Sequence, residues 1–365
     1  MRQQELQTMS ANSYRLVGYF PSYAIHARNF HVADIPGALL THVVYAFAQV
    51  TADGVCASVK PKDDQVNFPQ LLALKQQYPQ LMTLISIGGA SNSGNFPSAA
   101  ATDASRQSLA QSCIAFMKQN GFDGLDIDWE FPEAADKANY AALLIELRRQ
   151  LDAQGSADGR SYLLTIAAPA SASHYVNLAL DQVQTSVDWI NLMAYDFYVA
   201  TSPVTDFDAP LYLPTDDPGA VGTRLGYNVD AAVKAYLAAG VPAGKLVVGT
   251  HFEGTGWQGV PNTNNGLYQP NIGPANGTWG AGSFDYKDLA QNYLPSYSRF
   301  WHDIAQVPWL YNSTTGIMIS YDDPQSLSLK AGYVVDNALG GIMIWQLSAD
   351  NEEHSLLNAI AQVLG

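Results

Sequence analysis

Residues 123–130 read Asp-Gly-Leu-Asp-Ile-Asp-Trp-Glu, so four acids crowd onto one short stretch of a chain in which only 14% of residues are charged. At the strand period of two, Asp126, Asp128 and Glu130 project to one side, and the apolar residues between them project to the other. Carboxylates repel one another and lose solvation when buried, so selection keeps such a cluster mainly where chemistry needs it. The stretch predicts a strand with a functional acidic face.

That acidic face predicts a general acid. Successive acids along it lie about 6.5 to 7 Å apart at their Cα atoms, close enough for neighbouring side chains to share a proton or a substrate atom. They cannot all ionise at neutral pH, so at least one should keep its proton and serve as a general acid. Glu130 is last in the row and has the longest side chain, so we predict that it is this acid.

A cation site is the alternative reading of the same spacing. A calcium loop needs a turn glycine and polar intervening residues, whereas Leu, Ile and Trp stand between these acids. A magnesium site at the strand end stays open as a less favoured alternative. A merely solvated acidic face is disfavoured by the apolar alternation. We therefore predict no metal and no other cofactor.

The stretch DGLDIDWE resembles the Asp-x-x-Asp-x-Asp-x-Glu signature of the family-eighteen glycoside hydrolases, the chitinases and their relatives. Further segments resemble barrel strands of that family, in the family's order: GYFPSY, THVVYAFAQV, LISIGGAS, NLMAYDFY, KLVVGT and GGIMIWQLSAD. The resemblance spans roughly Tyr14 to the C-terminus.

The alternation of strand-like and helical patterns favours a parallel barrel, and the resemblance implies the (β/α)8 TIM type. Asp103 is expected to cap a helix with an apolar stripe of Leu109, Cys113 and Phe116, and Gly121 to end it. Strand-like runs occupy residues 16–20, 42–47, 82–87, 124–128, 163–168, 189–194, 246–250 and 342–345. Active sites on this fold lie at the carboxyl ends of the strands.

The domain organisation follows from length. The chain has 365 residues, and a barrel takes about 250 before insertions. Residues 257–320 break the regular pattern and resemble the small α+β domain that many bacterial chitinases insert after the seventh strand. We expect a catalytic barrel of residues 14–256 and 321–365, an insertion of residues 257–320 that walls one side of the cleft, and an N-terminal extension of residues 1–13.

The composition limits which binding partners and which cellular location we expect. A net charge of −15 with 18 dispersed Lys and Arg argues against nucleic acid, and no apolar run reaches the roughly 18 residues of a membrane span. The two cysteines make no disulfide framework, and Cys113 is expected in the core. The start of the chain lacks the apolar core of a signal peptide, so a leader was removed or export uses another route. We expect a secreted monomer that binds chitin or chito-oligosaccharides.

The resemblance also implies a mechanism. Asp128 and Glu130 are too close on one strand to flank a sugar ring, so another nucleophile is needed. In the family, the carbonyl oxygen of the substrate's N-acetyl group attacks the anomeric carbon and forms an oxazolinium ion, with net retention. The matching positions imply that Glu130 protonates the leaving oxygen, Asp128 holds the acetamido N–H, Asp126 shares a proton with Asp128, and Tyr195 donates to the acetamido oxygen. Asp123 looks structural.

Substrate-binding residues are carried over in the same way. Trp345 matches the tryptophan floor under the reacting sugar, although a core tryptophan is the alternative. Met193 and Asp196 are expected beside that sugar, although Asp196 has the opposite strand parity to Tyr195. The remaining expected contacts or pocket residues are Tyr19, Phe47, Ser86, Gly88, Gly89, Trp129 and Trp279, of which Phe47 and the two glycines are as readily packing residues.

Two departures from the family pattern bear on specificity. Glu253-Gly254-Thr255-Gly256-Trp257 stands where relatives usually have Tyr-Gly-Arg-Gly-Trp, and Gly280 follows Trp279 where similar bacterial enzymes often have Glu. Because of these two departures, the contacts to the sugars that flank the reacting one cannot be carried over from the family. A chitinase is the main prediction. An endo-β-N-acetylglucosaminidase acting on N-glycans and a non-catalytic lectin are the rivals, and the presence of Glu130 disfavours the lectin.

Overall fold

A closed barrel of parallel strands organises the computed structural model, which describes residues 14–365. The predicted extension, residues 1–13, lies outside the described residues. The strands follow the order β1-β14-β8-β7-β6-β5-β4-β2, and pairing of β1 with β2 closes the ring. They are β1 (Arg15–Pro21), β2 (His42–Val50), β4 (Met82–Gly88), β5 (Gly124–Asp128), β6 (Leu163–Pro169), β7 (Trp189–Met193), β8 (Leu246–His251) and β14 (Gly341–Trp345). The predicted TIM-barrel class is confirmed.

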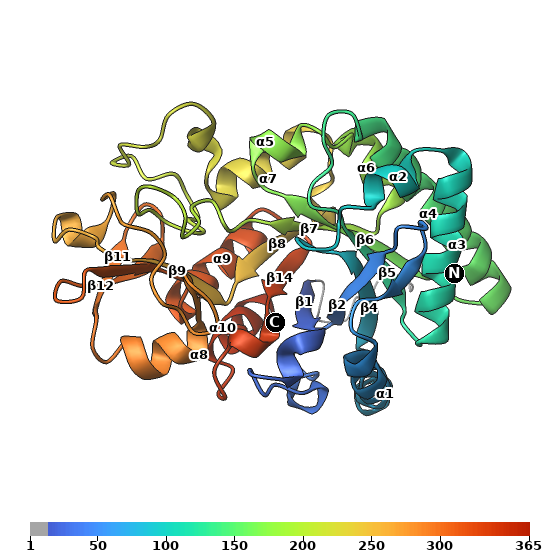
Figure 1. Cartoon of the computed structure of the whole chain (residues 1–365), viewed down its shortest axis with the longest axis horizontal. Helices are drawn as coiled ribbons and strands as arrows, with labels where there is room; N and C mark the ends of the chain where they lie inside the picture. The colour runs from blue at the N-terminus through green and yellow to red at the C-terminus, as the bar shows by residue number, and fades with distance from the viewer. Residues whose placement is uncertain (1–13) are drawn as a thin grey trace, which may run out of the picture.

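Helices surround this barrel (Figure 1). They include α1 (Pro61–Gln77), α2 (Phe96–Ala100), α3 (Asp103–Gln119), α4 (Lys137–Asp158), α5 (Ala172–Tyr175), α6 (Leu180–Ser186), α7 (Val229–Ala238), α9 (Pro324–Asp336) and α10 (Ser355–Leu364). The predicted cap of α3 was wrong by one residue. The Thr102 side chain accepts the Ser105 N–H, so Thr102 is the N-cap and Asp103 is the first helical residue. Gly121 follows the helix at φ 73°, which suits glycine.

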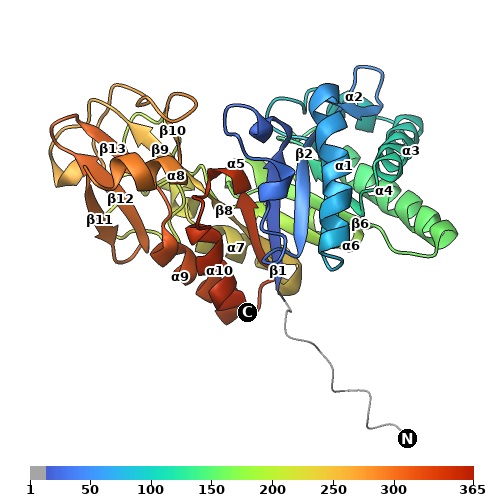
Figure 2. The ribbon, with the colours of Figure 1, turned by 90° about the horizontal axis from the view of Figure 1, so that it is seen from below.

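A second, antiparallel sheet lies between β8 and β14 in the chain, in the order β10-β9-β13-β12-β11. Its strands are β9 (Glu253–Trp257), β10 (Ser283–Asp285), β11 (Ser298–His302), β12 (Val307–Asn312) and β13 (Ile317–Ser320), and the short α8 (Tyr286–Asp288) follows β10. Figures 1 and 2 both show this sheet as a lobe beside the barrel. Because β9 leaves the barrel almost directly after β8, the sheet begins before the predicted boundary at residue 257.

Two apolar layers hold the barrel together. Side chains that point outward from the strands pack under the helices, and Cys113 belongs to this layer, as predicted. Side chains that point inward form a smaller cluster of Val17, Tyr19, Val44, Ala46, Leu84, Trp189, Val247 and Met343. Polar groups also lie inside the barrel, where Ser86, Thr165 and Asn191 contact Asp126. No helix in residues 14–365 is long and apolar enough to cross a membrane.

Candidate active site

Asp126 lies at the base of the site, inside the barrel and fully buried. Four donors surround its carboxylate: Tyr19 Oη (2.8 Å), Ser86 Oγ (2.8 Å), Thr165 Oγ1 (2.6 Å) and Asn191 Nδ2 (3.4 Å). Burial raises its pKa, and hydrogen bonds from these donors oppose the rise. Among the described residues, no hydrogen bond joins Asp126 to Asp128. Neutral donors occupy the oxygens of Asp126 instead. The proton that Asp126 is expected to share with Asp128 stays a prediction.

Asp128 is buried at the end of β5, and its Oδ1 has no hydrogen-bond partner in the described structure. Burial, then the charges of Glu130 and Asp126, raise its pKa well above the usual range. The backbone of Asp128 is bonded to the residue that follows β4, because the Gly89 N–H donates to the Asp128 carbonyl oxygen at 2.7 Å. A Cβ at Gly88 would lie 2.1 Å from the same oxygen, so the two glycines act through close packing.

Glu130 stands just beyond β5, half-buried at the mouth of the barrel. Ser93 holds its backbone, since Ser93 Oγ accepts the Glu130 N–H at 3.0 Å and donates to the Asp128 carbonyl oxygen at 3.1 Å. Burial, followed by the charge of Asp196, raises the pKa of Glu130 to about 7. A carboxylic acid that keeps its proton near neutrality can serve as a general acid.

A cavity of about 540 Å³ opens in front of Asp128 and Glu130. The ring of Trp345 lies 5.8 Å from that of Tyr19 and stacks at 5.9 Å on that of Phe47. These three side chains, with Met193, Tyr195 and Asp196, also line the cavity. The barrel therefore gathers most of the predicted contacts around the acid, and the cavity volume suits a small organic group or a few sugar rings.

Tyr195 and Asp196 lie just after β7. Burial, then nearby carboxylates with Asp196 first, raise the pKa of Tyr195 well above its usual range, so its phenol stays a donor. Asp196 has φ 58°, a left-handed backbone that turns its side chain into the cavity despite the opposite strand parity. This turn resolves the parity conflict that the sequence raises.

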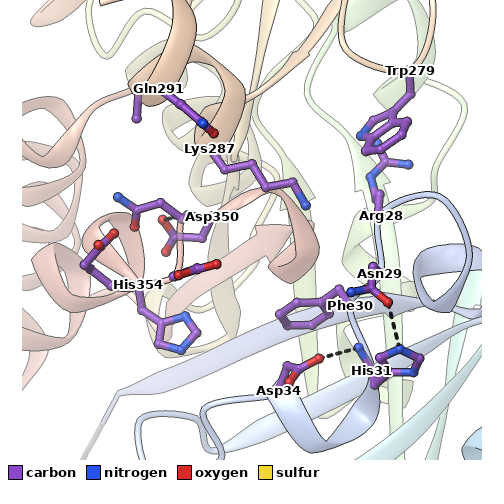
Figure 3. Close-up of a pocket in the computed structure, with 14 residues that line it drawn as sticks. Arg28, Asn29, Phe30, His31, Asp34, Trp279, Lys287, Gln291, Asp350 and His354 are labelled. Carbon is purple, nitrogen blue, oxygen red and sulfur yellow. Dashed lines mark hydrogen bonds between the residues drawn. The ribbon is translucent and has the colours of Figure 1, made fainter.

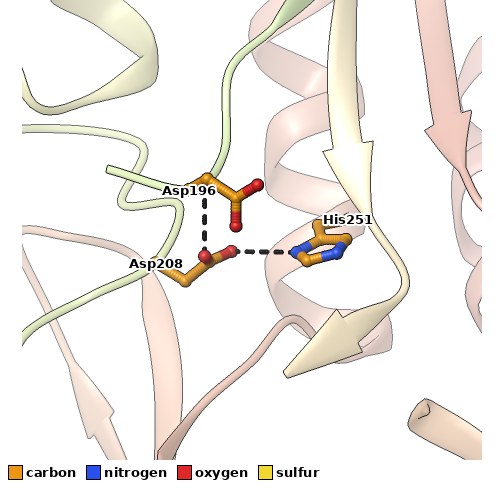
Figure 4. Close-up of side chains that lie close together, drawn as sticks. All are labelled: Asp196, Asp208 and His251. Atoms are coloured by element: carbon orange, nitrogen blue, oxygen red, sulfur yellow. Dashed lines mark hydrogen bonds and ion pairs between the residues drawn. The ribbon is translucent and has the colours of Figure 1, made fainter. Parts of the chain in front are cut away.

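Asp196, Asp208 and His251 form a cluster beside the cavity (Figure 4). Each offers one possible metal-ligand atom, and these atoms lie within 4.8 Å of one another. However, His251 Nδ1 lies 3.3 Å from Asp208 Oδ2, and His251 Nε2 lies 3.3 Å from Glu253 Oε2. Both imidazole nitrogens therefore face carboxylates, an arrangement that a doubly protonated imidazolium satisfies without a metal ion.

Two tryptophans predicted to contact substrate lie away from this cavity. Trp129 is only 3% exposed, and its ring stacks on Phe96 at 5.1 Å and meets Tyr140 at 5.7 Å. Its position corrects the prediction, because strand alternation turns Trp129 outward into the core between barrel and helices. Trp279 lines a second cavity of about 1150 Å³, shown in Figure 3, near Arg28. A substrate contact at Trp279 stays a prediction for that second cavity.

Several residues of the site were not predicted from the sequence. Thr165 could have been predicted, because it is a polar residue in the otherwise apolar run of β6. His251 is the last residue of the largely apolar strand β8, but nothing in the sequence pairs it with Asp208. Arg28 contacts Glu253 at 3.0 Å and Asp285 at 3.1 Å, across more than half of the chain. Such contacts depend on the closed barrel and leave no local pattern.

The chain is similar to known proteins in sequence and in structure. A sequence model of the glycosyl hydrolases family 18 matches residues 15–350. Chitinase A1 of Niallia circulans is 39% identical over 402 residues, covering 94% of this chain and 58% of that protein, so the chain spans less than two thirds of this relative. The structure of chitinase ChiA74 from Bacillus thuringiensis matches with TM-score 0.92 at 34% identity, covering 96% of this chain and 70% of the other. A family 18 N-acetylglucosaminidase from Paenibacillus barengoltzii matches with TM-score 0.84 at 33% identity, covering 96% and 99%.

Proposed function

Since the chain belongs to glycosyl hydrolase family 18 and is therefore a glycoside hydrolase, we propose that it is a chitinase. It hydrolyses β-1,4-linked N-acetylglucosamine polymers or oligomers with retention of the anomeric configuration. One observation carries this proposal. Glu130, with a pKa raised to about 7, opens onto the cavity beside a buried Asp128 whose Oδ1 has no hydrogen-bond partner within residues 14–365. An acid and an unsatisfied carboxyl on one wall suit a sugar that brings its own nucleophile.

In the first half of the reaction, Glu130 gives its proton to the glycosidic oxygen while the bond from that oxygen to the anomeric carbon breaks. The acetamido carbonyl oxygen of the same sugar attacks the anomeric carbon and forms the oxazolinium ion. Asp128 accepts the acetamido N–H, which turns the group toward the anomeric carbon. Tyr195, kept as a phenol by its raised pKa, donates to the acetamido oxygen.

In the second half, Glu130 is ionised and takes a proton from a water molecule. The water oxygen bonds to the anomeric carbon on the face that the leaving group vacated, and the oxazolinium ring opens. The N-acetyl group is restored, and the product has the starting anomeric configuration. The aromatic ring of Trp345 suits the apolar face of the reacting sugar, where it excludes water and orients the ring.

Replacing Glu130 by Gln tests the proposal. The amide keeps the shape of the side chain but has no transferable proton, so kcat on chitin oligomers should fall by roughly 10²- to 10⁴-fold. Binding of the oligomer, measured by calorimetry, should change little. Glu133→Gln is a matched control, because Glu133 is exposed and close in sequence. Near-normal hydrolysis by Glu130→Gln refutes the proposal.

The activities of related enzymes can be separated by their products. Digestion of defined chitin oligomers should yield shorter N-acetylglucosamine oligomers that start in the β configuration, as seen by NMR. Release of intact N-glycans from glycoproteins, with no attack on chitin oligomers, favours the endo-β-N-acetylglucosaminidase. Release of single sugars alone indicates an N-acetylglucosaminidase.

An insoluble polymer is met outside the cell, so we also propose that the protein is secreted. We further propose that it works as a monomer. Activity against chitin in the culture medium of the producing cells, and the mass of the active species by light scattering, check these two points.

A further inference from the structure

We propose that His251 is a positioning residue of the active site, an imidazolium held between Asp208 and Glu253 that keeps Asp196 ionised beside the catalytic acid. The effect on catalysis rests on the proposed function, whereas the charge of His251 can be measured without any activity assay. The cluster of Asp196, Asp208 and His251 thereby has a role that needs no metal ion.

The position of His251 supports a link to the cavity. It ends β8, its side chain is buried, and its ring stacks on Tyr195 with centroids 5.1 Å apart and planes 25° apart. Tyr195 lines the cavity. Figure 4 shows Asp208 in contact with both Asp196 and His251. His251 therefore lies directly behind residues that line the cavity.

The contacts of Glu253 favour its ionised form. Its carboxylate accepts hydrogen bonds from Arg28 Nη2 (3.0 Å), Gln346 Nε2 (2.9 Å) and Ser283 Oγ (3.3 Å). All of these groups donate, so no oxygen needs to carry a proton. Although burial alone would raise the pKa of Glu253, hydrogen bonding and charge from His251 and the charge of Arg28 lower it overall.

Asp208 is likewise surrounded by donors. Its Oδ1 accepts the backbone N–H of Asp196 and the hydroxyl of Thr255, each at 3.2 Å. Its Oδ2 is left to His251. An ionised carboxylate only accepts, so His251 needs an N–H on both ring nitrogens to satisfy Asp208 on one side and Glu253 on the other. Only the charged imidazolium has both.

The balance of forces on His251 agrees with this assignment. Burial alone would lower its pKa, but hydrogen bonds to Asp208 and Glu253, with the charges of Asp208 and Asp196, raise it well above the usual range. The other charged groups nearby are already paired: Arg28 binds Glu253 and Asp285, and Lys330 lies 2.5 Å from Asp322, whose charge acts on the same cluster.

The charge of His251 affects the catalytic acid, Glu130, through Asp196. Burial and the charge of Asp208 raise the pKa of Asp196 to about 6, and His251 opposes this rise. Ionised Asp196 in turn raises the pKa of Glu130. Without the imidazolium, the pKa of Asp196 moves up toward that of Glu130. Fewer molecules then hold Asp196 ionised and Glu130 protonated at the same time.

Nuclear magnetic resonance of the protein labelled with ¹⁵N-histidine tests the charge directly. The signal of His251, identified by its loss in His251→Asn, should be that of an imidazolium throughout pH 5 to 8. His42 is the internal control, because burial lowers its pKa to about 4 and it should stay neutral over the same range. A neutral His251 at pH 6 overturns the inference, as does Zn²⁺ binding that shifts only the His251 signal.

The pH dependence of kcat/KM tests the consequence. In His251→Asn and His251→Gln the acidic limb should move up by about one pH unit, so that kcat/KM falls about tenfold at pH 5 and by about twofold or less at pH 7. His42→Asn, at the opposite end of the barrel, should leave the profile unchanged. An equal loss at every pH indicates a merely structural role and overturns the inference. Failure of the Glu130→Gln test alone leaves the NMR result standing and removes the proposed function instead.

Discussion

The two ends of strand β5 place acids in opposite environments. At the amino end, Asp123 contacts Lys75 Nζ and Arg160 Nη2, each at 2.7 Å, and accepts the Thr83 N–H at 2.8 Å. Burial alone would raise the pKa of Asp123, yet these partners lower it overall. At the carboxyl end, Asp128 and Glu130 form no ion pair with a Lys or Arg of residues 14–365, and both have raised pKa values.

The difference separates folding from function on a single strand. A paired carboxylate such as Asp123 favours the folded state, because the partners stabilise its charge where it is buried. The unpaired acids at the other end cost stability whenever they ionise, and this cost keeps a proton available for chemistry. The charge at the amino end of β5 therefore favours folding, whereas ionised acids at the carboxyl end disfavour it.

Removing the substrate's acetamido carbonyl should have the largest effect on the functional end. Fully deacetylated chitosan offers no internal nucleophile, so its hydrolysis should be slower than that of chitin oligomers of equal length by on the order of a thousandfold or more. Reducing ends measured over time give both rates. Rapid release of glucosamine oligomers would mean that a protein carboxylate, such as Asp196, attacks the sugar.

Asp123→Asn should have the next largest effect, and only on stability. It leaves Lys75 and Arg160 without their common partner, but both cations are partly exposed and can regain water. We therefore expect a loss of about 2 to 3 kcal/mol in the free energy of unfolding, with kcat nearly unchanged. Urea denaturation measures the loss. The matched variant is Asp128→Asn, which should cost activity without lowering stability; a similar loss of stability in both variants contradicts the contrast between the two ends.

The pH dependence of stability should show the smallest effect. Glu130 has an ordinary pKa of 4.5 in the unfolded chain and about 7 in the fold, so the folded state holds more protons between these values. The free energy of unfolding should therefore fall as pH rises, by about 2 kcal/mol between pH 5 and 7 from this residue. Glu130→Gln should remove this part of the slope in urea titrations at the two pH values. An unchanged slope shows that Glu130 is not the group that titrates.

Much of the fold could be predicted, because its signals are local. The apolar runs that form β5 and β8 begin at the predicted residues, and the stop at Gly121 needs only one glycine in the left-handed region. The error at the α3 cap has a local cause as well, since Thr102 and Asp103 are both capping residues and only the observed hydrogen bond to Ser105 distinguishes them.

The candidate site could be predicted only in part. Tyr195 and Trp345 lie at the mouth of the barrel because strand ends converge there. Trp129 was misplaced, although the same alternation that points the acids inward points it outward. The side chain of Asp196 could not be oriented from strand parity, because its left-handed backbone depends on the loop that brings Asp208 to its N–H.

Strands, helices and the row of acids on β5 could be read from the sequence, because they follow from side-chain periodicity over a few residues and from turn chemistry. The alternation favoured a parallel barrel, and the family resemblance implied the TIM type. The charge of each acid, in contrast, depends on the folded barrel. Asp126 meets its donors, Asp123 its cations and His251 its two carboxylates across long stretches of chain. These contacts exist only when the barrel closes, and the pKa of a buried group is set by such neighbours and by the water it has lost.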